Sequence, residues 1–299
     1  MSVNAQAGAK GRQLHKFGGS SLADAKCYLR VAGIMKEYSQ AGDMMVVSAA
    51  GSTTNQLISW LKLSQSDRLA AHQVQQSLRR YHTELIGGLV EPAAADTLIA
   101  AFIHDLERLA GLLDGGVSEA VYAEVVGHGE VWSARLMAAV LNQLGMEAAW
   151  LDARAFLRAE RAAQPQVDEG LSYPLLQQLM AQHPNKRLVV TGFISRNQAG
   201  ETVLLGRNGS DYSATQIGAL AGASRVTIWS DVAGVYSADP RKVKDACLLP
   251  LLRLDEASEL ARLAAPVLHA RTLQPVSASD IDLQLRCSYT PEQGSTRIE

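Results

Sequence analysis

The amino-acid sequence predicts a single α/β domain, because short apolar segments alternate along the chain with longer segments of helical periodicity. Four of the apolar segments end in short loops of Gly, Ser, Thr and Asp, and at least three of these loops lead into helices. The 299 residues contain no internal repeat, no low-complexity tract and no clear linker. We therefore expect one domain over residues 13–299, preceded by a flexible tail of small and polar residues over 1–12.

Strands are predicted for short runs that carry apolar residues, and 188–193 is interpreted as a continuous apolar run. These runs cover residues 13–17, 44–48, 148–152, 188–193 and 226–229, and a hairpin turn at 197–200 returns through 201–205. Helical spacing predicts helices over 21–38, 56–63, 212–221 and 254–264, and helical blocks over 67–113 and 119–144. The block 67–113 is expected to hold two or three helices, broken near Gly87-Gly88 and Pro92. Ser21 is expected to cap the first helix, with Asp24 in the capping-box position.

Charge and hydropathy narrow the kinds of partner. The formal net charge is -2 and the sequence pI is about 6.4, which argues against nucleic-acid binding. No apolar run resembles a signal peptide or is long enough to span a membrane. The three cysteines, Cys27, Cys247 and Cys287, are odd in number and scattered, so we expect reduced thiols in a cytosolic protein.

The first Gly-rich loop, residues 16–21 (KFGGSS), is a candidate phosphate site. Lys16 stands at the end of an apolar strand, where an ammonium without a partner would be costly. Gly18 and Gly19 would let backbone N–H groups come close to a phosphate. The alternative is a lysine on an edge strand followed by a simple turn, and this motif alone does not decide between the two.

The second loop, residues 206–211 (GRNGSD), is a candidate substrate site. The planar guanidinium of Arg207 can bind a carboxylate through two hydrogen bonds. Asp211 could orient a lysine or a metal-bound phosphate. The alternative is a solvated turn in which Ser210 and Asp211 cap a helix, and capping is compatible with function.

Two further segments are candidates for ligand binding. Residues 229–236 (WSDVAGVY), followed by Asp239-Pro240-Arg241, offer an acid, an aromatic ring and an arginine that suit an adenine and its phosphates. The alternative there is a β-turn and a Pro-marked loop. Glu130 follows a Gly-His-Gly break at the start of a helix and could accept hydrogen bonds from a substrate ammonium. Taken alone, Glu130 is more simply a carboxylate favoured by the helix dipole.

Together these motifs resemble the aspartokinase family. The segments at 16–21, 129–130, 206–211 and 230–236 occur in the order seen in that family, and VLHART at 267–272 also matches. The resemblance covers nearly the whole chain and is strongest to the kinase part of the type II bifunctional aspartokinase–homoserine dehydrogenases. It implies the amino-acid-kinase fold, a three-layer α/β/α sandwich around a mostly parallel sheet. The N-terminal part would bind the amino acid, and the part from about residue 206 would bind ATP.

The resemblance implies phosphoryl transfer from ATP to the side-chain carboxylate of L-aspartate, with Mg²⁺ bridging the phosphates and no protein cluster holding the metal. It places the protein in the cytoplasm, at the first step of the aspartate-derived pathway to lysine, threonine and methionine. The full-length protein would carry a homoserine dehydrogenase, and we expect a homo-oligomer, for which the helical block 67–113 offers a surface.

The resemblance also implies roles for single residues. Lys16 would neutralise charge on the transferred group, and Asp211 would orient Lys16 or hold the amino group. The nucleotide would be bound by Gly18, Gly19, Ser20, Ser230, Asp231, Tyr236 and Arg241. The substrate would be bound by Thr54, Glu130, Arg207 and Ser210.

The chain departs from the family pattern at two positions. Asn208 stands where many members have Gly, while Gly209 and Ser210 remain. Pro266 stands where many members have a nucleotide-contacting lysine, and Lys242 or Lys244 are candidates to replace it.

Two alternative functions remain open from the sequence. One is another kinase of the same fold, acting on glutamate, N-acetylglutamate or a nucleotide monophosphate. The other is an inactive binding module that supports a fused enzyme. Glu130 and Arg207 favour a free amino acid with an ammonium and a carboxylate, and Lys16 with Asp211 favours an active kinase.

Overall fold

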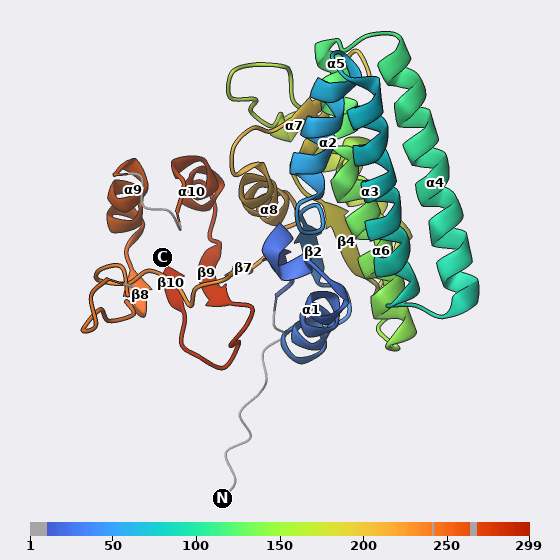
Figure 1. Cartoon of the computed structure of the whole chain (residues 1–299). Helices are drawn as coiled ribbons and strands as arrows, with labels where there is room; N and C mark the ends of the chain where they lie inside the picture. Colours follow the sequence, from blue (N-terminus) through green and yellow to red (C-terminus); the bar gives the residue numbers. More distant parts are fainter. Residues whose placement is uncertain (1–10, 241, 264–267) are drawn as a thin grey trace, which may run out of the picture.

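The computed structural model, which describes residues 11–240, 242–263 and 268–299, is an eight-stranded sheet with helices on both faces (Figure 1). The strand order is β3-β4-β2-β1-β7-β9-β10-β8. Within this sheet β9 and β10 pair antiparallel, and the other neighbouring strands pair parallel. The predicted α/β class, with a mostly parallel sheet between two helical layers, is therefore confirmed.

The five strands predicted from apolar runs are neighbours in the sheet, from the edge strand β3 to β7. The eight strands are β1 (Gln13–Phe17), β2 (Met44–Val47), β3 (Ala148–Leu151), β4 (Arg187–Thr191), β7 (Arg225–Ser230), β8 (Leu251–Leu252), β9 (Asp282–Cys287) and β10 (Thr296–Ile298). The predicted hairpin is confirmed as β5 (Ile194–Arg196) and β6 (Thr202–Leu204), with Asn197 accepting the Gly200 N–H in its turn.

The sheet is buried on both faces, and β2 shows how. Because successive side chains of a strand point to opposite faces, Met45 and Val47 enter one hydrophobic core while Met44 and Val46 enter the other. All four residues are fully buried. A parallel strand with both faces covered needs such a continuous apolar run, which is the pattern that the sequence shows here.

The two cores are covered by different helices (Figure 1). One core is covered by α1 (Ala25–Tyr38), α2 (Thr53–Ser64), α3 (Arg68–Gly87), α4 (Pro92–Asp114), α5 (Glu119–Val126) and α6 (His128–Gln143). The other is covered by α7 (Glu169–Gln182), α8 (Gly209–Leu220), α9 (Leu254–Arg262) and α10 (Ala270–Ser277). Two short 3₁₀ turns, η1 (Gly19–Leu22) and η2 (Ala153–Ala155), follow β1 and β3.

The block 67–113 forms two helices, as the Gly87-Gly88 pair and Pro92 predict. The side chain of Asp67 accepts the Ala70 N–H and so caps α3, while Gly88 ends that helix. Pro92 opens α4 at its first position, where the missing N–H has no intrahelical partner to lose.

Three predicted helix starts are wrong by several residues, and one of them is that of α8, which begins at Gly209 instead of residue 212. Asp24, not Ser21, caps α1, because its side chain accepts the Cys27 N–H, and the preceding residues form η1 instead. The helix expected from residue 56 begins at Thr53, within the loop after β2.

Several elements were not predicted, for physical reasons. Both α7 and α10 contain a proline, Pro174 and Pro275, which reads as a break in a single sequence. β9 alternates between buried and half-buried residues, and β8 and β10 span two and three residues. Their place in the sheet depends on pairing with β7 and with each other, which local sequence does not carry.

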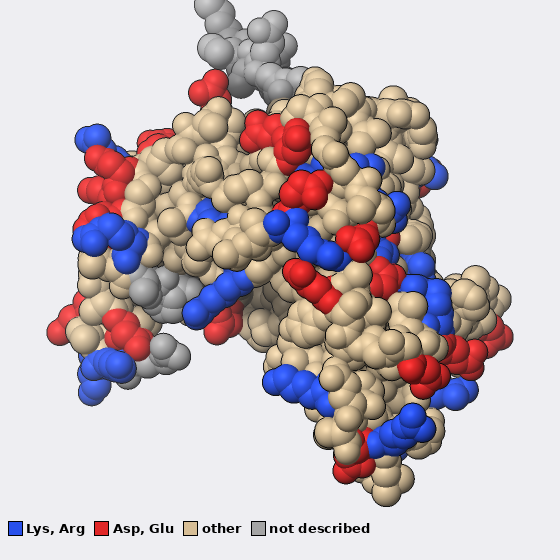
Figure 2. All heavy atoms as spheres, turned by 90° about the horizontal axis from the view of Figure 1, so that it is seen from above, with Lys and Arg blue, Asp and Glu red and all other residues tan. Residues whose placement is uncertain are grey.

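The surface agrees with the charge balance. Lys and Arg side chains are interspersed with Asp and Glu over the face drawn in Figure 2, rather than gathered by sign. Among the described residues, no helix is both long enough and apolar enough to cross a membrane.

Candidate active site

The candidate residues gather at one edge of the sheet. β4, β2, β1 and β7 are consecutive, parallel neighbours, so their carboxyl ends lie side by side. In α/β sheets of this kind, ligands bind in the crevice outside these ends. The segments that leave the four strands carry Gly192, the loop at 48–52, the loop at 16–21, and Ser230 with Asp231.

Lys16 and Asp211 form an ion pair at this edge. The Lys16 Nζ lies 2.5 Å from the Asp211 Oδ1, and Lys16 is 9% exposed. Lys16 is the penultimate residue of β1, and Asp211 lies in the first turn of α8, which contacts β1. Because β1 lies between β2 and β7, the alternative of a lysine on an edge strand is wrong. A nearly buried ammonium held by a single carboxylate suits a site that receives further negative charge.

The loop after β1 packs closely against the loop after β2. A Cβ on Gly19 would lie 2.9 Å from the Ala49 carbonyl oxygen, so only glycine fits there. The Gly51 N–H also donates to the Gly19 carbonyl at 3.0 Å. A Cβ on Gly18 would lie 3.5 Å from the Lys16 Nζ, so the ammonium lies beside the loop backbone. Ser20 is exposed, which leaves the loop open to a ligand.

Glu130 is the most perturbed carboxyl group of the site. It lies in the first turn of α6 and is 3% exposed. Burial raises the pKa of Glu130 to about 8, although backbone hydrogen bonds at Glu130 and Ala49 act in the opposite direction. Its Oε2 is buried without a hydrogen-bond partner among the described residues. The dipole alone does not account for a buried, half-satisfied carboxyl, whereas a substrate ammonium would satisfy it.

Close packing places Glu130 near the loop that follows β2. A Cβ on Gly129 would lie 2.8 Å from the Ala49 Cβ and 3.1 Å from the Thr53 Cγ2, so α6 can approach this loop only through glycine. Thr54 is the second residue of α2 and is half-buried. Its neighbour Thr53 is buried and donates to the Ala50 carbonyl at 2.6 Å, which anchors the start of α2.

The 206–211 loop turns sharply into α8. Asn208 has φ 55°, a left-handed conformation that glycine adopts with less strain. This conformation is consistent with the Gly that many family members have at this position. Ser210 packs beside the end of β4, since a Cβ on Gly192 would lie 2.9 Å from the Ser210 Oγ. Arg207 is exposed, so its guanidinium is available to a ligand.

Arg271, which has no role predicted from the sequence, holds the residue that precedes this loop. It is 7% exposed, its Nη1 donates to the Leu205 carbonyl at 2.5 Å, and its guanidinium lies 4.2 Å from the Tyr212 ring centroid. The signal in the sequence was the matching VLHART segment, but the contact across the sheet edge depends on α10 packing on α8.

The segment after β7 is ordered by its own backbone. The Ser230 hydroxyl donates to the Val232 carbonyl at 3.1 Å, Asp231 is exposed, and Tyr236 is half-buried and pairs with Leu248. Lys242 and Lys244 are exposed. Arg241 and Pro266 lie outside the described residues, so the expectations for them stay predictions.

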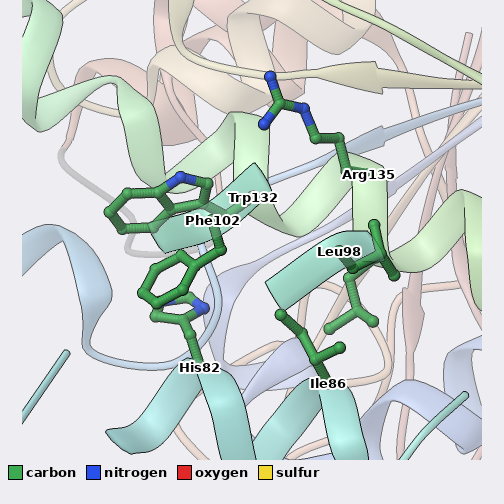
Figure 3. A pocket seen from close by; sticks show the side chains of 7 residues that line it. His82, Ile86, Leu98, Phe102, Trp132 and Arg135 are labelled. Atoms are coloured by element: carbon green, nitrogen blue, oxygen red, sulfur yellow. The ribbon is translucent and has the colours of Figure 1, made fainter. Parts of the chain in front are cut away.

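A separate small pocket lies in the helical layer, away from the sheet edge. Figure 3 shows the rings of His82, Phe102 and Trp132 packed against one another, with centroids 4.8 to 5.0 Å apart. Burial lowers the pKa of His82 to about 3, so its ring is neutral. Such a lining does not suit a phosphorylated ligand, and we regard the pocket as part of the hydrophobic core.

Comparison with known proteins agrees with this geometry. The chain is 87% identical over all 299 residues to the bifunctional aspartokinase/homoserine dehydrogenase 2 of Escherichia coli K12, and it covers 37% of that protein. It matches the crystal structure of E. coli aspartokinase III in complex with aspartate and ADP with a TM-score of 0.88 and 30% identity, over 96% of this chain and 64% of that one. It also matches Clostridium acetobutylicum aspartate kinase with a TM-score of 0.79 and 25% identity, over 96% of this chain and 62% of that one.

The chain thus spans about a third of the length of the first relative, and less than two thirds of each solved structure. The model of the amino acid kinase family matches residues 11–287, which include the Gly-rich loop at 16–21, Glu130 and the Lys16–Asp211 pair. The chain therefore belongs to the amino acid kinase family.

Proposed function

We propose that this chain transfers the γ-phosphoryl group of ATP to the side-chain carboxylate of L-aspartate, giving 4-phospho-L-aspartate. One observation carries the proposal: the buried carboxyl of Glu130, whose Oε2 has no partner among the described residues, lies beside the loop after β2, at the sheet edge that carries the Lys16–Asp211 pair and the Gly-rich loop. A site that offers an acid to an ammonium and a cation to phosphates suits a free amino acid and a nucleotide together.

The two ligands would divide the site between the two parts of the chain. The N-terminal part would bind the amino acid, with Glu130 on its ammonium and Thr54 near its side chain. The part from about residue 206 would bind ATP, mainly through Ser230, Asp231 and Tyr236, except that Arg207 and Ser210 face the amino acid. The phosphates would lie on the backbone N–H groups of 18–20, beside the Lys16 ammonium, which a Cβ on Gly18 would approach to 3.5 Å.

Mg²⁺ fits this arrangement as a metal carried by the nucleotide. No group of three or more His, Cys, Asp or Glu in the part of the chain that the structure describes could hold a metal ion by itself. Mg²⁺ in kinases is typically bound by phosphate oxygens, waters and one or two carboxylates. When bound, it would screen the negative charge of the phosphates.

The residues of the chain would then act by position and charge. An aspartate side chain has an unperturbed pKa of about 3.9, so its carboxylate is already ionised and needs no general base. The repulsion between this carboxylate and the phosphates is the main obstacle, and Lys16 would lower it by stabilising charge on the transferred group. Asp211 would hold the Lys16 ammonium in place at 2.5 Å. Arg207 would orient the α-carboxylate through its planar fork.

Hydroxylamine trapping tests the proposal, because only an acyl phosphate yields a hydroxamate. The chain is incubated with Mg·ATP and, in parallel, aspartate, glutamate, N-acetylglutamate or a nucleotide monophosphate. We expect hydroxamate with aspartate alone. Hydroxamate with glutamate or N-acetylglutamate, or phosphorylation of the nucleotide, would assign another kinase of this fold. ATP binding without turnover of any substrate would instead favour an inactive module.

We further propose the context in which the activity operates. The 87% identical relative is a bifunctional aspartokinase/homoserine dehydrogenase, which supports fusion of this chain to a homoserine dehydrogenase and a role at the first step of the aspartate-derived amino-acid pathway. A homo-oligomer in the cytoplasm is part of the same proposal. Size-exclusion chromatography with light scattering, at several concentrations, tests the assembly.

A further inference from the structure

The residues that follow β9 contact the Gly-rich loop at 16–21, which is called the phosphate loop below. β9 is the next strand after β7, and β7 is the next after β1, so the exits of these three parallel strands are adjacent. Ser288 is the first residue after β9, and its N–H donates to the Ser230 carbonyl at 2.8 Å. Ser288 and Ser21 are both fully buried, so neither hydroxyl is exposed to bulk solvent.

The hydroxyl of Ser288 connects two segments of the nucleotide site. Its Oγ lies 2.8 Å from the Ser21 Oγ and 3.1 Å from the Ser230 carbonyl oxygen. A serine hydroxyl has one proton, and a carbonyl oxygen can only accept. The Ser288 hydroxyl therefore donates to the Ser230 carbonyl, and the Ser21 hydroxyl donates to Ser288. The result is a directed relay from the phosphate loop, through Ser288, to the end of β7.

The next residue makes a second tie to the same loop. The Tyr289 hydroxyl donates to the Ser20 carbonyl at 3.3 Å. The Arg30 guanidinium, from α1, lies 4.1 Å from the centroid of the Tyr289 ring and holds the ring from the other side. Two consecutive residues after β9 therefore hold two consecutive residues of the loop.

We propose that Ser288 is a positioning residue for the nucleotide, which sets the phosphate loop relative to the segment at 230–236 through the Ser21–Ser288–Ser230 relay. The inference rests on the nucleotide site of the proposed function. The phosphates and the adenosine of one ligand would rest on these two segments, so a loop held at the correct spacing before binding lowers the ordering cost of binding. Ser288 is fully buried, so it would act through Ser21 and Ser230 rather than by touching the nucleotide.

The test compares Ser21→Ala, Ser288→Ala and the double variant with the unaltered chain. Calorimetry measures Mg·ADP affinity, and steady-state kinetics measures KM for ATP and for aspartate. Each single variant should weaken Mg·ADP binding and raise KM for ATP by roughly two- to tenfold, the usual effect of one hydrogen bond. KM for aspartate should stay unchanged. The double variant should bind Mg·ADP no more weakly than the single variant with the lower affinity, because both changes break the same relay.

Ser195→Ala is the matched control, because Ser195 is also fully buried and donates to a backbone carbonyl, that of Val203 at 3.2 Å, in the hairpin. It should leave nucleotide affinity unchanged. Ser21→Ala keeps the bond between Ser288 and Ser230, so it remains informative if Ser288→Ala fails to fold. Unchanged Mg·ADP affinity in folded Ser21→Ala, additive effects in the double variant, or an equal rise in both KM values would overturn the proposal. Since ADP binding is measured without turnover, failure of aspartate phosphorylation would be recognised separately.

Discussion

Replacing Glu130 by glutamine should raise the free energy of unfolding as the pH rises, while it removes aspartate binding. Burial raises the pKa of Glu130 from 4.5 to about 8 in the ligand-free protein. Well below pH 4.5 the carboxyl is protonated in both the folded and unfolded states, so its raised pKa does not change the free energy of unfolding. Between pH 4.5 and 8 the unfolded chain releases this proton while the folded chain keeps it, so folding loses stability as the pH rises. Above pH 8 both states are ionised and the loss is constant.

The magnitude follows from about 1.4 kcal/mol for each pH unit. At pH 7 the buried carboxyl should cost the folded state about 3 kcal/mol, and from pH 8 about 5 kcal/mol. Glu130→Gln keeps the shape of the side chain but removes the titration. The amide has its own burial cost, which does not change with pH. The pH dependence of the difference between the two proteins is therefore the informative quantity.

Urea unfolding of both proteins at pH 5, 6, 7 and 8, without ligands, measures this difference. The free energy of unfolding of Glu130→Gln, relative to the unaltered chain, should rise by about 2 to 3 kcal/mol between pH 5 and pH 7. Aspartate binding should be lost at the same time, because the amide cannot pair with the substrate ammonium as a charge. Parallel stability curves over this range would mean that Glu130 is already ionised in the folded protein, and would refute the reasoning.

Three further outcomes follow from the site. Aspartate binding at pH 7 should release about one proton, because Glu130 has to ionise to pair with the ammonium; calorimetry in buffers of different ionisation enthalpy measures it, and equal heats in all buffers would contradict it. Arg207→Lys should raise KM for aspartate about ten- to hundredfold while KM for ATP stays near its original value, because lysine lacks the planar fork; a parallel rise in both constants would make Arg207 a phosphate or structural residue. Lys16→Met should lower kcat by at least about 10² while ATP binding by calorimetry persists, because the lost cation faces charge that develops in transfer; a kcat reduced less than about tenfold with an unchanged melt would remove Lys16 from that role.

The local sequence determined the central strands and most of the residues at the sheet edge. β2 and most of β4 are continuous apolar runs, a pattern typical of strands with two covered faces, and β1, β2, β4 and β7 are each followed by small or polar residues. The Gly18-Gly19 pair also indicates a close backbone approach, and a Cβ on Gly19 would indeed lie only 2.9 Å from the Ala49 carbonyl oxygen.

Tertiary structure alone decided what these residues meet. Lys16 belongs to a central strand and pairs with Asp211 because β7 and β2 flank β1 and α8 packs across them, an order set by contacts between distant segments. Glu130 has the usual sequence signature of a first-turn carboxylate, and only its burial by neighbouring elements raises its pKa. Ser21 and Ser288 are 267 residues apart, so their bond depends on β9 lying beside β7. Local preference acts over a few residues, whereas sheet order and burial are properties of the whole packed chain.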